Sequence, residues 1–210
     1  MWRGVPQKED RPVSLVSQLI QHMSLKCFAG FEPTSSSERT MTVQPRRVTL
    51  SALTPDDAHR TLQGQRRAGE SWAREYPMPV DRDLIHSLIV EHADGRIVGP
   101  FTHYQVELHT NRVVIGGAGF LGPPDEFGAV EITLGIVPEH MGHGYGAEVV
   151  AALVDIAARA GADFVIASSK VANVGTHSTL IAGGLTEIVR DDTTVHFAAI
   201  LADHAERSKA

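Results

Sequence analysis

The spacing of hydrophobic and polar residues becomes regular near residue 46 and then follows the two periods of secondary structure. Apolar residues that alternate with polar ones are typical of half-buried strands, and short apolar runs are typical of fully buried ones. Such segments occur at residues 47–53, 104–109, 112–121, 130–137, 164–168, 187–190 and 194–201. The sequence therefore predicts a sheet of about six to seven strands.

Helical spacing, in which apolar residues recur every three or four positions, separates these strands. It is found at residues 54–67, 81–91, 144–160 and 176–182. Thr54 is a typical cap residue before Pro55 in the first of these helices, and Gly161 ends the third. A strand meander followed by a strand–helix–strand unit predicts an α+β fold, a three-layer α/β/α domain with a mixed, largely antiparallel sheet.

The first 44 residues lack this regular pattern, so we expect an N-terminal extension (1–44), one folded domain (45–205) and a short tail (206–210). Residues 34–39 are polar, as in flexible segments. Residues 13–28 have the spacing of a short amphipathic helix, either a docking or dimer helix or an appendage. Met41 stands just before the regular pattern, which suggests the hypothesis that translation begins there.

Composition narrows the class of protein. The chain has 210 residues with a formal net charge of −6, which argues against a general nucleic-acid surface. Cys27 is the only cysteine, so intrachain disulfides and multi-cysteine metal sites are excluded. We find no apolar run of about 18 residues that would span a membrane, and we expect a cytoplasmic protein that does not bind membranes.

The most informative segment joins the strand at residues 130–137 to the helix at 144–160. It contains Gly142, Gly144 and Gly146 at alternate positions. Glycine permits sharp turns and close approach of the backbone to a ligand, and the free N–H groups and dipole of a helix N-terminus attract anions. This pattern predicts a phosphate-binding loop.

Other interpretations of the loop fit less well. The residues also satisfy the dinucleotide fingerprint G-x-G-x-x-G/A, but that turn normally follows the first strand of its domain, and the acid expected about twenty residues later is missing. A nucleoside-triphosphate loop needs Gly-Lys-Ser/Thr, which does not occur here. A glycine-rich turn without a ligand is the remaining alternative.

The loop resembles the signature of the GNAT superfamily of acetyl-coenzyme A-dependent N-acetyltransferases, Gln/Arg-x-x-Gly-x-Gly/Ala after a strand. The resemblance extends to Asn173 and to Gly183-Gly184-Leu185. The order of elements over about three-quarters of the chain is also similar, as is the Gly-rich strand at residues 116–124. The chain is most similar to the branch that contains ribosomal-protein N-terminal acetyltransferases and many small-molecule acetyltransferases.

This resemblance implies a GNAT-like fold and acetyl-coenzyme A as the co-substrate, with no metal. The residues implied to bind the cofactor are Ile136, Val137, Met141, Gly142, His143, Gly144, Tyr145, Gly146, Ala147, Asn173 and Thr176. The sequence departs from the family at Met141, where Arg or Gln is usual, and His140 and His143 are candidates to compensate. Leu180 stands where many members have a tyrosine that protonates the thiolate, and Leu185 replaces a phenylalanine.

The implied reaction is direct attack of a primary amine on the thioester. Glu131, on the strand that leads to the loop, is the first candidate for the base, and a solvated or salt-bridged face is the alternative. Glu148 fits better as an acid that offsets the helix dipole. Tyr145, His177 and Ser178 are the candidates for the acid, and the sequence does not choose among them. Trp72 and Tyr76 fit either a substrate wall or the core.

Two functions follow. The first is an N-acetyltransferase that acts on a primary amine of a small molecule or a protein N-terminus. The alternative is a non-catalytic module that binds acetyl-coenzyme A as a sensor or partner, favoured by the changes at Met141 and Leu180. The expected partners are an amine-bearing small molecule or a peptide N-terminus, and a homodimer is left open.

Overall fold

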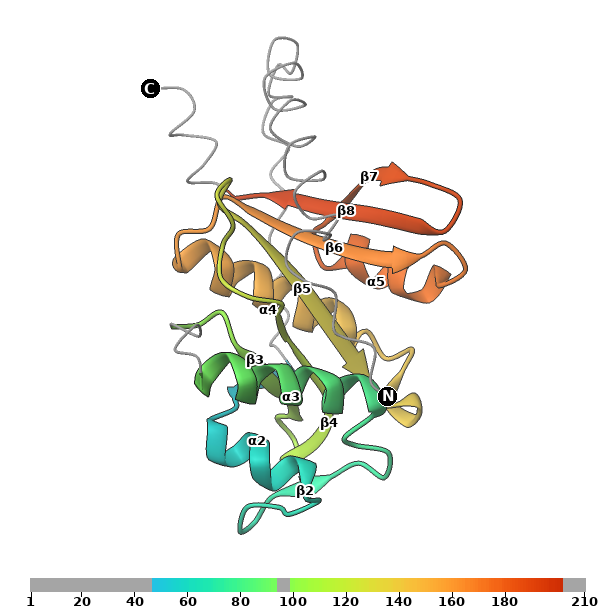
Figure 1. Cartoon of the computed structure of the whole chain (residues 1–210). Helices are drawn as coiled ribbons and strands as arrows, with labels where there is room; N and C mark the ends of the chain where they lie inside the picture. Colours follow the sequence, from blue (N-terminus) through green and yellow to red (C-terminus); the bar gives the residue numbers. More distant parts are fainter. Residues whose placement is uncertain (1–46, 94–98, 202–210) are drawn as a thin grey trace, which may run out of the picture. The chain divides into compact units, whose positions relative to one another are not determined.

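The computed structural model describes residues 47–93 and 99–201 (Figure 1). These residues belong to the second of two units of the chain, Arg46–Ala210. The predicted helix at 13–28, the start at Met41 and the tail at 206–210 lie outside the described residues.

The described residues form a mixed sheet of eight strands. The strands are β1 (Val48–Ala52), β2 (Ser71–Trp72), β3 (His103–Leu108), β4 (Val113–Phe120), β5 (Ala129–Ile136), β6 (Phe164–Lys170), β7 (Thr186–Arg190) and β8 (Thr194–Ile200). The order across the sheet is β1-β3-β4-β5-β6-β8-β7, with β2 paired to β4. Pairing is antiparallel except between β5 and β6 and between β2 and β4. All seven predicted strands are confirmed, and two-residue β2 was missed because it is too short to show a period.

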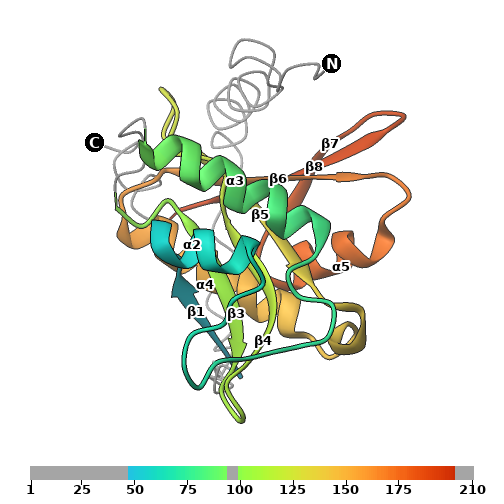
Figure 2. The same cartoon turned by 60° about the horizontal axis from the view of Figure 1, so that its bottom comes forward.

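The sheet is covered by helices on both faces, as predicted. The helices are α2 (Pro55–Leu62), α3 (Pro79–Ala93), α4 (Tyr145–Arg159) and α5 (Val174–Ala182), and a 3₁₀ turn, η2, spans Pro138–His140. Figures 1 and 2 show α2 and α3 on one side of the sheet and α4 and α5 on the other. Strand β5 lies between the two layers: Gly135 contacts Met78, which precedes α3, and Leu134 faces Gly146 of α4.

Helix α2 has the predicted cap but ends earlier than predicted. The Thr54 hydroxyl accepts from the N–H of Asp57, and the Asp57 carboxylate accepts from the N–H of Thr54, which completes a capping box. The helix ends at Leu62, not near residue 67, and Gly64 follows with a φ of 71°. The chain after it turns back, so that the Arg67 side chain reaches Asp57.

Helix α4 carries the predicted apolar stripe. Val149, Val150, Leu153 and Ala157 are fully buried against the sheet. Full burial of each larger side chain contributes about 1.5–3 kcal/mol. This packing fixes the helix, and with it the N-terminus that follows the glycine loop.

Strands β5 and β6 pair at their beginnings and then separate. Their register covers only Ala129–Glu131 against Phe164–Ile166. Beyond it, β5 stays paired with β4 to Ile136, while β6 stays paired with β8 to Lys170. Figure 1 shows the two strands running apart. We use the term slot for the part of the sheet where β5 after Glu131 and β6 after Ile166 are no longer paired with each other. An unpaired strand edge is where an extended ligand can add as a further strand, and β5 continues from here into the glycine loop.

Candidate active site

The glycine loop connects the end of β5 to the start of α4. Gly142 and Gly144 have φ values of 78° and 81°, a backbone region that disfavours residues with a Cβ atom. Gly144 is the residue before the helix, and no side chain caps it. The alternating glycines are therefore required by the backbone path, and this path leaves the helix N-terminus open.

The N–H groups of this loop are available to an anion. Among the described residues, the N–H groups of residues 142–147 have no hydrogen-bond acceptor, whereas Met141 donates to Pro138 and Glu148 donates to Gly144. The loop stands at the N-terminus of a 15-residue helix, whose dipole adds partial positive charge there. The geometry suits a diphosphate held by main-chain donors.

Arg47 ties this loop to the start of β1. Its Nε donates to Glu148 Oε1 at 2.6 Å, its backbone N–H donates to Oε2 at 2.7 Å, and its Nη2 donates to the His143 carbonyl at 2.9 Å. Its guanidinium carbon also lies 4.8 Å from the Tyr145 ring centroid. Glu148 was predicted only to offset the dipole, and the structure adds this ion pair. The partner was missed because it lies about a hundred residues earlier in the chain.

Replacing Arg47 is expected to weaken acetyl-coenzyme A binding. In Arg47→Leu the Glu148 carboxylate loses its partner beside the proposed diphosphate site, and the His143 carbonyl is released. We expect about a tenfold weaker Kd by isothermal titration, with partial recovery when Glu148→Gln is added. Arg190→Leu breaks a bidentate pair with Glu187 in β7 and is the matched control. An unchanged Kd in Arg47→Leu would remove Arg47 from this role.

The aromatic side chains of the loop pack against one another. The His143 ring stacks on Tyr145 with centroids 5.7 Å apart and planes 18° apart. His143 Nδ1 donates to the Met141 carbonyl at 2.9 Å. The Met141 side chain is 58% exposed and has no group that could donate a hydrogen bond to a ligand of the loop. Tyr145 is thus held between neighbours in the loop, and its role as the acid stays a prediction.

Glu131 lies where the slot opens. It pairs with Ile166 at the last rung between β5 and β6, and its side chain is half-buried. Alternation along β5 places Glu131, Thr133 and Gly135 on one face. The contact of Gly135 with Met78 shows that this is the face of α3. A base at this position would act on an acceptor that enters from the α3 side.

The residues at the start of α5 have structural partners. Asn173 Oδ1 accepts from the Thr176 N–H at 3.3 Å and caps the helix. The His177 ring packs on Phe197, and its Nε2 donates to the Lys170 carbonyl at 3.0 Å. Ser178 donates to the carbonyl of Val174, one turn earlier. These bonds favour structural roles for His177 and Ser178, and the cofactor-binding roles of Asn173 and Thr176 stay predictions.

Trp72 and Tyr76 belong to the hydrophobic core on the α3 side. Their rings meet edge to face with centroids 5.4 Å apart. Burial raises the pKa of Tyr76 far above its usual value. Both side chains pack with the core, and a role of either in a substrate wall stays a prediction.

Asp81 and His103 form a buried pair that sequence reasoning missed. Asp81 is fully buried and His103 is 4% exposed. Asp81 Oδ1 and His103 Nε2 have no hydrogen-bond partner, and both surround Gly117, where a Cβ would lie 2.4 and 2.8 Å from them. Burial raises the pKa of Asp81 to about 6 and lowers the pKa of His103 to about 4. The available signal was the glycine inside a strand, which marks close approach of another group.

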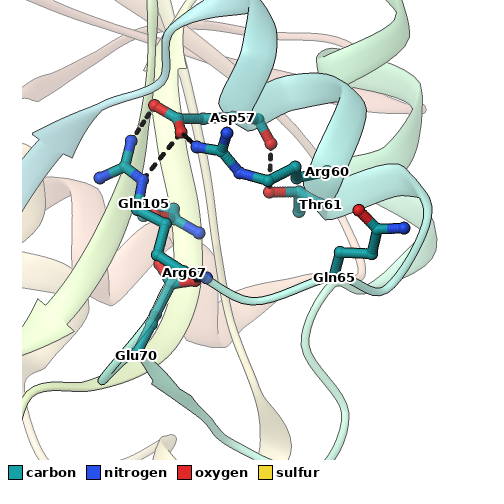
Figure 3. Close-up of a pocket in the computed structure, with 7 residues that line it drawn as sticks. All are labelled: Asp57, Arg60, Thr61, Gln65, Arg67, Glu70 and Gln105. Carbon is teal, nitrogen blue, oxygen red and sulfur yellow. Dashed lines mark hydrogen bonds and ion pairs between the residues drawn. The ribbon is translucent and has the colours of Figure 1, made fainter.

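A separate polar hollow lies beside α2 (Figure 3). Asp57 is 4% exposed and accepts from both Arg60 and Arg67, with Arg67 Nε at 2.8 Å from Oδ1. Figure 3 shows the two guanidinium groups meeting at this carboxylate. These ion pairs therefore occupy the hollow, and they hold the segment that follows α2 against Asp57 in the first turn of the helix.

Within the described ranges 47–93 and 99–201, no three His, Cys, Asp or Glu side chains are grouped so as to hold a metal ion. None of the described helices combines the length and apolar character needed to cross a bilayer.

Comparison with known families identifies the class of protein. The model of the acetyltransferase (GNAT) domain matches residues 47–186, from the start of β1 to the first residue of β7. The fold is thus that of an acyltransferase. The chain belongs to the GNAT acetyltransferase family, which confirms the resemblance inferred from the loop.

Solved structures show the same fold. The ribosomal-protein-S5-alanine acetyltransferase from Vibrio fischeri is 13% identical, with a TM-score of 0.54 over 76% of this chain and 96% of that one. The spermidine N-acetyltransferase from Vibrio cholerae in complex with CoA and spermine is 16% identical, with a TM-score of 0.54 over 76% of this chain and 98% of that one. The search of curated proteins gave no match.

Proposed function

We propose that this protein is an N-acetyltransferase that moves the acetyl group of acetyl-coenzyme A to a primary amine. The observation that carries the proposal is the slot between β5 and β6, which leads into a loop whose N–H groups at 142–147 have no acceptor among the described residues. The two similar structures are named for acetylation of a polyamine and of a ribosomal protein. The acceptor class is therefore an amine-bearing small molecule or a protein N-terminus.

The cofactor is held mainly by main chain. The N–H groups of residues 142–147 bind the diphosphate, and the edge of β5 at Ile136 and Val137 pairs with the pantetheine arm like an added strand. Because backbone makes these contacts, Met141 in place of Arg or Gln is compatible with binding. Arg47 and Glu148 keep the loop in the required shape.

The chemistry needs an unprotonated amine. An alkylammonium has a pKa of about 10.4, so it must lose a proton before attack at neutral pH. Glu131 accepts this proton directly or through water. The nitrogen then attacks the thioester carbonyl, the carbon–sulfur bond breaks, and coenzyme A leaves as its thiolate.

The experiment is to mix the full chain with acetyl-coenzyme A and a panel of amines and N-terminal peptides, and to follow free thiol. Amine-dependent thiol release supports the proposal.

A specific observation favours the alternative of a non-catalytic module: Leu180, at the position of the family tyrosine, is buried at 1% exposure and has no hydroxyl. Thermal stabilisation by acetyl-coenzyme A without thiol release across the panel would favour that alternative.

Glu131→Gln is expected to lower turnover more than affinity. Glutamine keeps the size of the side chain and cannot take up the proton, so kcat should fall by about 10²–10⁴-fold. The KM for acetyl-coenzyme A should change by less than about twofold because the loop contacts remain. Glu126→Gln, at an exposed position of the loop before β5, is the control. Equal turnover of Glu131→Gln and the parent across the pH range would exclude Glu131 as the base.

Two further expectations stay predictions. One similar structure, of the Vibrio cholerae spermidine N-acetyltransferase, is described as dodecameric. A homodimer of this chain is to be tested by light scattering. The cytoplasmic location expected from the sequence likewise stays a prediction.

A further inference from the structure

Ser168 and His196 form a hydrogen-bonded pair on neighbouring strands. They are direct partners in the register of β6 and β8, and Ser168 Oγ lies 3.0 Å from His196 Nδ1. Ser168 is exposed, while His196 is 8% exposed. The pair thus presents a hydroxyl to the solvent with an imidazole behind it. Both residues lie within strands, so neither side chain caps a helix.

The pair stands at the opening of the slot. The last rung between β5 and β6 joins Glu131 to Ile166. Residues paired across a sheet point to the same side, and alternate residues share a face, so Ser168 lies on the face of Glu131 and Thr133. Ala167 and its partner Phe197 point to the opposite side, where Phe197 meets His177 of α5. Ser168 therefore borders the slot on the side from which the acceptor approaches.

One proton of the reaction, which must pass from the attacking nitrogen to the departing sulfur, has no assigned acceptor or donor. The attacking nitrogen still holds an excess proton after the bond to carbon forms, and the departing sulfur needs one. Tyr145 is stacked between neighbours in the loop, His177 donates to a carbonyl, and Ser178 donates within its own helix. Leu180 has no proton to give.

We propose that Ser168 and His196 form a proton relay that carries this proton from the attacking nitrogen to the sulfur. As the nitrogen loses its proton to Ser168 Oγ, the hydroxyl passes its own proton to neutral His196 Nδ1. When the carbon–sulfur bond breaks, the proton returns from the imidazolium through Ser168 to the thiolate. The first proton, lost by the ammonium to Glu131, goes to solvent, so the overall products are the amide, the thiol and one proton.

Both apolar and charged groups surround His196. Its neighbour in β7 is Val189, which is apolar. Asp191, in the turn between β7 and β8, interacts electrostatically with His196. Lys170 is the cation on the same face of β6. Glu131 stands across the slot.

The test compares Ser168→Ala and His196→Gln with the parent and with the double variant. This relay rests on the proposed N-acetyltransferase function. We expect kcat to fall about a hundredfold in each single variant and no further in the double variant, because the two side chains act as one unit. The Kd for acetyl-coenzyme A and the unfolding midpoint should stay close to those of the parent. Ser168→Thr keeps a hydroxyl and should recover most of the turnover.

Control variants separate the relay from a structural role. Ser169→Ala removes the adjacent hydroxyl, which faces away, and His109→Gln removes an exposed histidine; both should retain parental kcat. Parental kcat in Ser168→Ala, or an equal loss of acetyl-coenzyme A affinity, would overturn the relay alone. If the parent released no thiol with any amine of the panel, both the proposed function and the relay would be overturned.

Discussion

Gly144→Glu is expected to abolish measurable binding of acetyl-coenzyme A. The new carboxylate would enter the position of the diphosphate, where main-chain donors now face an open site, and two anions would compete for one helix N-terminus. We expect the Kd to weaken at least about hundredfold by isothermal titration, which corresponds to about 2.7 kcal/mol. A Cβ at this position would also lie 3.3 Å from Arg47 Nη2.

Gly161→Glu provides a matched control at the other end of α4. Gly144 and Gly161 share a φ of 81°, so both substitutions impose the same backbone strain, about 1–2 kcal/mol. Nothing lies within 4 Å of a Cβ at Gly161. The control should therefore lose similar stability and keep its affinity. Unchanged affinity in Gly144→Glu, or equal loss in both variants, would contradict the assignment of the diphosphate site.

The parts of the fold that were predictable are those set by local pattern. The alternation in β5 predicted both its strand and the two faces that separate Glu131 from Leu134. Gly142 and Gly144 predicted the loop because its backbone turns through positive φ values, which glycine adopts most readily. The Thr54 cap is local as well, and it was confirmed with its reciprocal bond.

The parts that were not predictable depend on which distant segments meet. Arg47 and Glu148 lie 101 residues apart, and Ser168 and His196 lie 28 apart, so no sequence window contains either pair. The end of α2 was misplaced although Gly64, with its positive φ, ends the helix locally; the Arg67–Asp57 contact that follows could not be predicted. Asp81 resembles an ordinary first-turn acid, and only the packing of α3 over Gly117 brings it to His103.

The buried pair Asp81 and His103 should give two variants whose stabilities change with pH in opposite directions. The pKa of Asp81 is raised to about 6 in the folded protein, so between its usual value near 4 and pH 6 the folded state binds the extra proton and stability falls as pH rises. The pKa of His103 is lowered to about 4, so between pH 4 and about 6.5 the unfolded state binds the extra proton and stability rises with pH. The two effects largely cancel in the parent from about pH 4 to 6.

Each single variant exposes the other residue's contribution. Asp81→Asn keeps an oxygen to accept the Met78 N–H, which Asp81 Oδ2 now accepts at 2.9 Å, and leaves His103 as the titrating group. Relative to the parent, its free energy of unfolding should gain a slope of about +1.4 kcal/mol per pH unit between pH 4 and 6, and His103→Gln should gain about −1.4. Urea unfolding at several pH values measures both slopes. Asp56→Asn and His92→Gln, at exposed positions of α2 and α3, should show neither slope.

The sign of these slopes shows whether Asp81 and His103 are neutral or form an ion pair in the folded protein. If Asp81 and His103 formed a carboxylate–imidazolium ion pair, the pKa of Asp81 would be lowered and that of His103 raised, and both slopes would reverse. Asp81 Oδ1 and His103 Nε2 have no hydrogen-bond partner and meet only around Gly117, which favours the neutral forms in this buried layer between α3 and the sheet. Slopes of the opposite sign would therefore require a direct ion pair and a rearranged packing of α3 on β3 and β4.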